Sequence, residues 1–191
     1  MSAPAVFLDR DGVLIEDVDR VTSEDQIQVI EGAPEALRTL ADAGYRLVVV
    51  TNQPIVARGL ATEEQVARIN EAVADRLSER GGARIEGAYY CPHHPHGYVA
   101  EYRAVCDCRK PRPGLILRAA RELDIDTSRS WMVGDRVTDI VAGRSAGCRT
   151  ALVRSGRHAD APIVTADPLP DDVEPNAACA DLRAVAELLT R

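Results

Sequence analysis

The segment AVFLDRDG, residues 5–12, places two aspartates directly after a run of apolar residues. The apolar run predicts a buried strand, and Gly12 predicts the tight turn that ends it. Asp9 and Asp11 then stand at the carboxyl end of an N-terminal strand, where open α/β sheets bind their ligands. Paired carboxylates repel each other, so such a pair usually holds a cation, shares a proton or does chemistry. A plain Asp-x-Asp-Gly turn is the alternative, and the rest of the chain decides between the two.

The composition is that of an ordinary soluble globular protein. The chain has 191 residues and a net charge of −7, and we expect residues 1–191 to form one domain. The negative charge argues against nucleic-acid binding, which needs a basic face. No apolar run approaches the roughly 20 residues of a membrane span, and the first residues lack a signal-peptide pattern. We therefore expect a cytoplasmic protein that binds no membrane.

Strand-like and helix-like segments alternate along the chain. Strands are expected at 5–8, 46–50, 86–90, 130–133 and 149–153, and helices at 34–43, 62–80, 115–123, 137–146 and 181–189. A short extended stretch is expected near 27–30, and a surface loop rich in proline and aspartate at 159–175. This alternation predicts an α/β fold, in which a parallel sheet is covered by helices on both faces.

Polar residues follow the ends of successive predicted strands. Asp9 and Asp11 follow the first strand, Thr51 and Asn52 the second, and Asp135 the fourth. The carboxyl ends of parallel strands lie at one edge of a sheet, so these side chains are expected to converge.

Lys110 can reach the same edge, because it lies beside Arg109 just before a predicted helix. Carboxylates bind a hard cation such as Mg²⁺ through oxygen. The cation, the Lys110 ammonium and the Thr51 hydroxyl would then stabilise phosphoryl oxygens in a transition state. The set therefore predicts a site for phosphate and magnesium.

The same residues resemble the four motifs of the haloacid dehalogenase-type phosphatases. Asp9-Arg10-Asp11-Gly12 resembles the first motif, Thr51-Asn52 the second, Lys110 the third and residues 134–139 the fourth. Each motif alone is weak, but the four in the right order are specific. The resemblance implies a single Rossmann-like domain with a parallel sheet.

The resemblance also implies a role for each residue. Asp9 is the expected nucleophile, which forms an aspartyl-phosphate, and Asp11 is the expected general acid and base. Thr51 and Lys110 are expected to hold the phosphoryl oxygens. Magnesium is expected between Asp9, the backbone carbonyl of Asp11, and Asp135.

The long predicted loop after residue 90 holds a second cluster. Cys91, His93, Cys106 and Cys108 offer four soft ligands in two close pairs. Four protein ligands of this type saturate a tetrahedral zinc ion and leave no open position, so the zinc is expected to be structural. His93 is favoured over the neighbouring histidines because Cys-x-His mirrors the Cys-x-Cys spacing.

Two other interpretations of these cysteines remain open. Reduced cysteines can occur together in a loop by chance, and a disulfide is rare in a reducing compartment. Cys148 and Cys179 lie far from the cluster and are interpreted as small apolar residues.

The residues of this loop make the resemblance more specific, because they point to one family of these phosphatases. Cys-Pro-His-His-Pro from residue 91 and Cys-Asp-Cys-Arg-Lys-Pro from residue 106, with Thr51-Asn52-Gln53 and Ala57-Arg58-Gly59, resemble the D-glycero-D-manno-heptose 1,7-bisphosphate 7-phosphatases. These small enzymes have no cap domain, and the zinc loop at about 91–108 helps to shape the pocket. The resemblance implies magnesium-dependent removal of the 7-phosphate of a small phosphorylated sugar, structural zinc, and a monomer.

The resemblance further implies which residues contact the substrate. By position these are Asp17, Arg20, Thr51, Asn52, Gln53, Pro54, Arg109, Lys110 and Arg136, and Arg58 can add charge from a flanking loop. Two positions depart from the family pattern. Pro54-Ile55 replaces the expected Ser-Gly, and Arg136 stands where lysine is frequent, which keeps the charge but alters its geometry. For Asp139, a surface or capping carboxylate and a supporting role behind the metal ligands both remain open.

Two other functions compete with this interpretation. Histidinol-phosphate phosphatases resemble the chain in the aspartate motif and the zinc loop. A zinc-stabilised binding protein on an inactive phosphatase fold is the second alternative. The presence of Asp9, Asp11 and Lys110 argues against the inactive fold, because loss of one of them would mark it.

Overall fold

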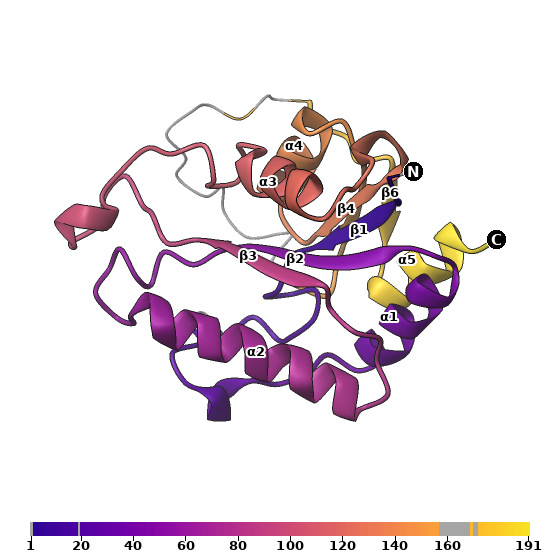
Figure 1. The fold of residues 1–191 in the computed structure, drawn as a ribbon, viewed down its shortest axis with the longest axis horizontal. Helices are drawn as coiled ribbons and strands as arrows, with labels where there is room; N and C mark the ends of the chain where they lie inside the picture. The colour runs from indigo at the N-terminus through magenta and orange to yellow at the C-terminus, as the bar shows by residue number, and fades with distance from the viewer. Residues whose placement is uncertain (1, 19, 157–168, 170–171) are drawn as a thin grey trace.

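The computed structural model describes residues 2–18, 20–156, 169 and 172–191, and its strands form one six-stranded sheet (Figure 1). The strands are β1 (Ala5–Leu8), β2 (Arg46–Asn52), β3 (Gly87–Cys91), β4 (Trp131–Gly134), β5 (Arg149–Val153) and β6 (Ala177–Cys179). They lie in the order β3-β2-β1-β4-β5-β6, and every neighbouring pair is parallel. The predicted parallel sheet is therefore confirmed. The chain runs outward from β1 in one direction and then from β4 in the other, so the topological switch point lies between these two strands.

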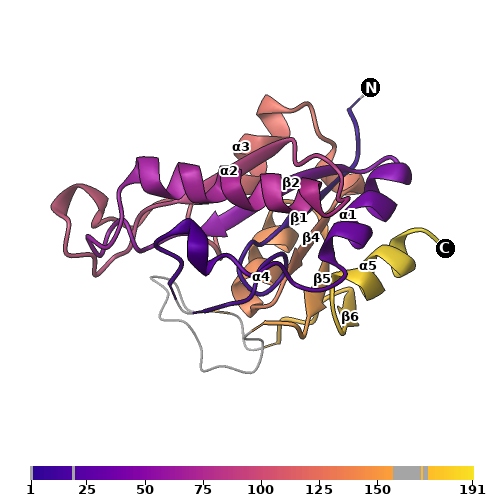
Figure 2. The same cartoon turned by 90° about the horizontal axis from the view of Figure 1, so that it is seen from below.

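Helices cover both faces of this sheet, as predicted. They are α1 (Ala33–Asp42), α2 (Glu63–Glu79), α3 (Gly114–Glu122), α4 (Val137–Ser145) and α5 (Leu182–Leu189). Helices α1, α2 and α5 lie on one face, and α3 and α4 lie on the other (Figures 1 and 2). Among the residues described, no helix is long and apolar enough to cross a membrane.

Side chains of β1 alternate between the two halves of the core. Val6 and Leu8 pack in the cluster formed with α1, α2 and α5, whereas Ala5 and Phe7 pack in the cluster formed with α3 and α4. Successive strand residues point to opposite faces, and here both faces are buried. This is why the strand has an uninterrupted apolar sequence.

Helix α2 carries a contact that ties it to the loop after β3. The helix begins with the predicted capping box, in which the Gln65 amide donates to Thr62 Oγ1 at 3.2 Å and the Thr62 amide donates to Gln65 Oε1 at 2.8 Å. Its first residue, Glu63, then accepts hydrogen bonds from the hydroxyls of Tyr90 and Tyr102, each at 3.0 Å. The N-terminal turn of α2 therefore anchors the loop.

The structure differs from the prediction in two places. Strand β6 was not expected, because Ala177–Cys179 contains no β-branched or aromatic residue and pairs only through β5. Strand β2 continues through Asn52, which pairs with the end of β3. The short extended stretch near 27–30 was expected, and Val29 there makes an isolated antiparallel bridge with Ile15. Most of the predicted loop at 159–175 lies outside the described residues.

Replacement of Phe7 tests the core between the sheet and α3. Phe7 is completely buried, so Phe7→Ala should lower the free energy of unfolding by about 3–5 kcal/mol through lost burial and a residual cavity. Urea denaturation measures this loss. Leu188→Ala is the matched control, because Leu188 is 40% exposed on α5 and its truncation should cost far less. Equal losses in the two variants would contradict this description of the core.

Candidate active site and metal cluster

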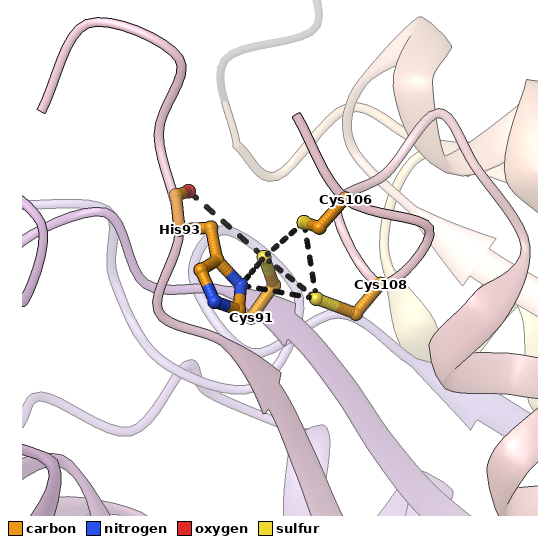
Figure 3. A group of neighbouring side chains, drawn as sticks. All are labelled: Cys91, His93, Cys106 and Cys108. Atoms are coloured by element: carbon orange, nitrogen blue, oxygen red, sulfur yellow. Dashed lines mark hydrogen bonds between the residues drawn. The ribbon is translucent and has the colours of Figure 1, made fainter. Parts of the chain in front are cut away.

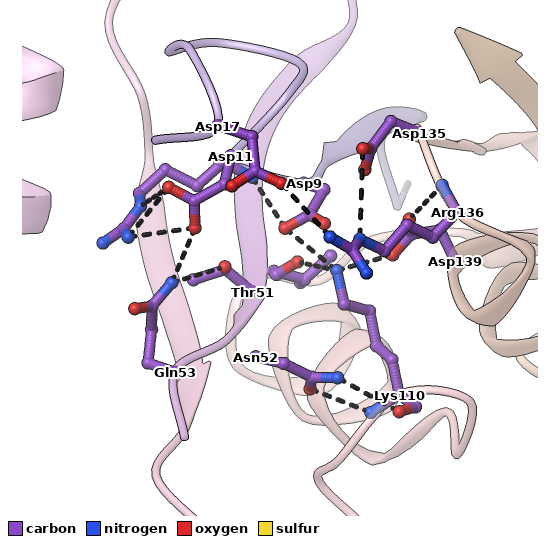
Figure 4. A network of polar contacts seen from close by, with 12 residues as sticks. Asp9, Asp11, Asp17, Thr51, Asn52, Gln53, Lys110, Asp135, Arg136 and Asp139 are labelled. Carbon is purple, nitrogen blue, oxygen red and sulfur yellow. Dashed lines mark hydrogen bonds and ion pairs between the residues drawn. The ribbon is translucent and has the colours of Figure 1, made fainter. Parts of the chain in front are cut away.

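The buried ammonium of Lys110 lies at the centre of the polar residues beyond the sheet edge (Figure 4). Its Nζ lies 3.0 Å from Asp9 Oδ1 and 2.6 Å from Asp139 Oδ1, and it donates a hydrogen bond to the carbonyl of Val50 at 2.9 Å. Burial alone would lower the pKa of Lys110, but the two carboxylates outweigh burial and raise it. Lys110 is therefore a fixed cation beside Asp9.

Asp139 is completely buried, so the surface alternative for this residue is wrong. Its Oδ2 accepts a hydrogen bond from the Arg136 amide at 3.0 Å, which confirms the capping alternative, and its Oδ1 pairs with Lys110. Burial raises the pKa of Asp139 to about 6 against the opposing effect of Lys110. Gly134 makes room for this carboxylate, because a Cβ there would lie 2.3 Å from it.

Thr51 and Asn52 come from the end of β2, as predicted. Asn52 holds the backbone of Lys110 in both directions: its Nδ2 donates to the Lys110 carbonyl at 3.1 Å, and its Oδ1 accepts from the Lys110 amide at 3.0 Å. Thr51 Oγ1 accepts a hydrogen bond from Gln53 Nε2 at 3.0 Å. The Thr51 hydroxyl hydrogen can therefore be donated to a ligand in the cavity.

Asp11 lies away from Lys110 and is held by a different set of donors. Arg10 contacts both of its carboxylate oxygens, and Gln53 Nε2 donates to its Oδ2 at 2.9 Å. Burial raises the pKa of Asp11, although the neighbouring Arg10 opposes this shift. A raised pKa favours a carboxyl group that can donate a proton.

Carboxylate oxygens of Asp9, Asp135 and Asp139 lie within 4.8 Å of one another in the described part of the chain. The backbone closes around Asp135, because a Cβ at Gly12 or at Gly156 would lie 2.7 or 2.2 Å from Asp135 Oδ2. Oxygen donors in a tight cradle suit a small hard cation such as Mg²⁺. Both oxygens of Asp139 are engaged, Oδ1 by Lys110 and Oδ2 by the Arg136 amide, whereas Lys110 and the Arg10 amide both contact Oδ1 of Asp9. Asp9 and Asp135 are therefore the stronger ligands of the three.

A cavity of about 280 Å³ lies at the carboxyl edge of the sheet, beside Asp9 and Lys110. Its lining residues are Asp9, Asp11, Asp17, Thr51, Asn52, Pro54, Arg58, Arg109, Lys110, Arg136 and Thr138. Carboxylates, a fixed ammonium and guanidinium groups around one cavity are what phosphoryl transfer requires.

Most residues predicted to contact a substrate line this cavity, but Arg20 and Gln53 do not. Gln53 is buried, and it donates hydrogen bonds to two residues that line the cavity, Asp11 and Thr51. No role is predicted from the sequence for Arg10 or Thr138. Only the position of Arg10 between two predicted catalytic residues could have drawn attention to it.

The second cluster joins the ends of the loop after β3 (Figure 3). Ligand atoms of Cys91, His93, Cys106 and Cys108 lie within 4.8 Å of one another. The three Sγ–Sγ distances are 3.2–3.5 Å, and His93 Nδ1 lies 3.4 Å from Cys108 Sγ. A zinc ion with tetrahedral bonds of about 2.3 Å to sulfur separates its ligands by roughly 3.8 Å, so the set fits zinc.

The distances argue against the other interpretations of these cysteines, since each Sγ–Sγ distance is longer than the roughly 2.05 Å of a disulfide and all four ligand atoms lie together. All five cysteines are free, so no disulfide forms. The hydrogen bond with Cys91 lowers the pKa of Cys108 to about 5, which favours the thiolate that binds metal. The ring of His94 turns elsewhere and accepts a hydrogen bond from the His96 amide at 3.1 Å. Cys148 is buried in the core, in agreement with its apolar role.

Two family models match most of the chain. A model described as haloacid dehalogenase-like hydrolase matches residues 6–83, and a second, described as HAD-hydrolase-like, matches residues 107–184. The D-glycero-beta-D-manno-heptose-1,7-bisphosphate 7-phosphatase of Yersinia pestis is 46% identical over 157 residues, 82% of this chain and 83% of the relative. The protein of that name from Pasteurella multocida is 48% identical and covers 80% of this chain and 83% of its own length.

Solved structures agree with these relatives. The D,D-heptose 1,7-bisphosphate phosphatase from B. bronchiseptica, crystallised with magnesium and phosphate, has a TM-score of 0.80 and 34% identity over 97% of both chains. A putative HAD-like phosphatase from Mesorhizobium loti has a TM-score of 0.81 and 30% identity, over 100% of this chain and 88% of that one. The fold is therefore shared over nearly the whole length of this chain.

Replacement of Cys108 tests the second cluster. We expect about one zinc ion per chain by elemental analysis, and Cys108→Ser should lower this content, because it removes one of four ligands. Cys148→Ser is the matched control, since Cys148 is a buried cysteine far from the cluster, and it should keep the full zinc content. Full zinc occupancy in Cys108→Ser would remove Cys108 from the set of ligands.

Proposed function

The chain belongs to the heptose 1,7-bisphosphate 7-phosphatase family of haloacid dehalogenase-like hydrolases, and we propose that it removes the 7-phosphate of D-glycero-D-manno-heptose 1,7-bisphosphate. It is a phosphoric monoester hydrolase. The observation that carries the substrate class is a pair of arginines, Arg58 and Arg109, in the wall of the cavity that holds Asp9 and Lys110. This pair suits an anionic group that does not react.

Asp9 is proposed as the nucleophile. Its orientation is fixed because Oδ1 contacts Lys110 Nζ at 3.0 Å and accepts the Arg10 amide at 2.8 Å. Attack of Asp9 on phosphorus forms an aspartyl-phosphate and breaks the bond to the sugar oxygen, which takes a proton from Asp11. Asp11 then removes a proton from the water that hydrolyses the intermediate and releases phosphate.

Lys110 and Thr51 hold the oxygens of the transferred group. The Lys110 ammonium stays charged, since two carboxylates raise its pKa, and the Thr51 hydroxyl faces the same cavity. Asp9, Asp135 and the backbone carbonyl of Asp11 would hold Mg²⁺, which supplies positive charge that offsets the repulsion between two anions. We propose that the zinc ion of the second cluster is structural, because its four protein ligands leave no open position.

The two arginines differ from Arg136, the third arginine of the cavity. Arg136 Nη2 is paired with Asp17 Oδ2 at 3.1 Å, so its charge is partly compensated. In the described residues, neither Arg58 nor Arg109 forms an ion pair with a carboxylate. Burial lowers the pKa of Arg109 against the opposing effect of Cys91 and Cys106, and the positive charge of Arg58 adds to the lowering. An anion between the two guanidinium groups would relieve this repulsion through paired hydrogen bonds.

This arrangement favours a bisphosphate over histidinol phosphate. Histidinol phosphate has one phosphate and a cationic amine, which the two arginines would repel. Every group of the proposed mechanism comes from one chain, so we propose that the enzyme acts as a monomer. We also propose that it acts in the cytoplasm on a small phosphorylated sugar.

A substrate panel tests the proposed function. Phosphate release should be compared for both anomers of the heptose bisphosphate, for fructose 1,6-bisphosphate and for histidinol phosphate, with magnesium present. We expect the highest kcat/KM with a heptose bisphosphate and release of its 7-phosphate. A higher kcat/KM for histidinol phosphate would overturn the proposal, and Pro54-Ile55 would then be the first position to examine.

Replacement of Arg109 tests the subsite for the second phosphate. Loss of a charged hydrogen bond of about 1.5–3 kcal/mol should lower kcat/KM for the bisphosphate roughly 10- to 150-fold in Arg109→Ala. The loss should be much smaller for the matching monophosphate. Arg118→Ala is the control, since Arg118 lies on α3 and pairs with Glu122 outside the cavity. Equal losses for both substrates would exclude this subsite.

Replacement of Asp9 tests the nucleophile. Asp9→Asn keeps the shape of the side chain but loses the charge needed for attack, so kcat should fall by about three orders of magnitude or more. The circular dichroism spectrum should be unchanged. Asp42→Asn, an exposed position at the end of α1, is the matched control and should keep full activity. Activity of Asp9→Asn within tenfold of the unmodified enzyme would disprove the assignment.

A further inference from the structure

Arg10 is a buried cation to which the proposed mechanism gives no task. It lies between Asp9 and Asp11 in sequence, is only 1% exposed, and is among the largest fully buried side chains described. Burial of a guanidinium is costly unless its donors are satisfied by partners of good geometry. Arg10 does not line the cavity, so it acts on a substrate only through another residue.

The contacts of Arg10 link the proposed general acid to helix α2. Arg10 Nε lies 3.2 Å from Asp11 Oδ1, and Nη2 lies 3.0 Å from each carboxylate oxygen of Asp11. On its other side, Nη1 donates to Asn70 Oδ1 at 2.9 Å. Asn70 is buried on α2, a helix far from Asp11 in sequence. Asn70 thus holds one end of the Arg10 guanidinium, and the other end holds the carboxylate of Asp11.

We propose that Arg10, anchored by Asn70, is a positioning residue that sets the orientation of the Asp11 carboxyl group toward the leaving oxygen. This inference rests on the proposed role of Asp11 as general acid. A single carboxylate can rotate about its Cβ–Cγ bond, whereas contacts from a planar guanidinium to both oxygens define its plane. Gln53 Nε2 adds a third contact, from β2, to Asp11 Oδ2.

Replacement of Asn70 can distinguish an effect of Arg10 on the orientation of Asp11 from an effect of the Arg10 charge. Asn70 is neutral and does not contact Asp11, so it can influence the acid only through the position of Arg10. Its Nδ2 has no hydrogen-bond partner among the described residues, so Asn70→Leu loses little besides the contact to Arg10. Asn70→Leu and Arg10→Lys, which keeps the charge without the planar fork, therefore test positioning with modest structural change.

The experiment measures single-turnover phosphoryl transfer to Asp9 from two substrates. Nitrophenyl phosphate has a good leaving group that needs little protonation, whereas the sugar phosphate depends on the acid. We expect Arg10→Met, Arg10→Lys and Asn70→Leu to slow transfer from the sugar phosphate roughly 10- to 100-fold, the scale of a misplaced catalytic group. Transfer from nitrophenyl phosphate should slow less than threefold, and KM for the sugar phosphate should stay within about threefold.

Arg76→Met is the matched control. Arg76 lies on the same helix and donates to the Ile27 carbonyl at 2.7 Å, away from the cavity, so its loss should leave both rates unchanged. Equal slowing of both substrates in Asn70→Leu and Arg10→Lys, or no slowing of either, would overturn the proposal. If Arg10→Met fails to fold, these two variants decide the outcome.

Asp11→Asn is measured in parallel, so that failure of the premise can be recognised. It should show the largest difference between the two substrates. If Asp11→Asn slows both substrates equally, Asp11 is not the acid, and the positioning role falls with it. If Asp11→Asn discriminates between the substrates but the Arg10 and Asn70 variants do not, only the positioning role is wrong.

Discussion

The ammonium of Lys110, buried between Asp9 and Asp139, is the contact on which the rest of the site depends. A charge taken out of water must be paired, so the chain has to bring at least one carboxylate to this point. Asp9 thereby acquires a fixed orientation, and Asp139 in turn fixes the start of α4 through the Arg136 amide. The same contacts that stabilise the buried cation therefore position the proposed nucleophile.

Helix α2 connects the two functional regions of the molecule. Its first residue, Glu63, accepts hydrogen bonds from Tyr90 and Tyr102 and so holds the loop of the cysteine cluster. Two turns later, Asn70 contacts Arg10, which contacts Asp11. Because a helix moves as a rigid unit, a shift of α2 would change the contacts of Glu63 and the contact of Asn70 together. The Cys/His cluster and the proposed general acid therefore share one support, helix α2.

The proposed selection of a substrate depends on the charged residues in the wall of the cavity. Arg136 is paired with Asp17, whereas Arg58 and Arg109 form no ion pair with a carboxylate among the described residues. Paired and unpaired guanidinium groups thus line the same cavity. We propose that the unpaired charge of Arg58 and Arg109 binds the phosphate of the substrate that does not react.

The sequence by itself determined the fold class and the main chemical groups, because both are written in local patterns. Apolar runs mark strands buried on both faces, and polar residues directly after them must meet at the carboxyl edge of a parallel sheet. Asp9, Thr51 and Asp135 were found in this way, and Lys110 by its place just before a predicted helix. The Cys/His cluster was found because the spacing of ligands within each pair is local.

Only the tertiary structure decided contacts between segments far apart in sequence. The ion pair of Asp139 with Lys110 and the contact of Asn70 with Arg10 join residues on different elements, and no periodicity encodes such pairs. Strand β6 likewise has no strand-like sequence and exists because β5 offers it a partner. Burial and pairing of charge depend on all neighbours at once, so they arise only when the elements pack.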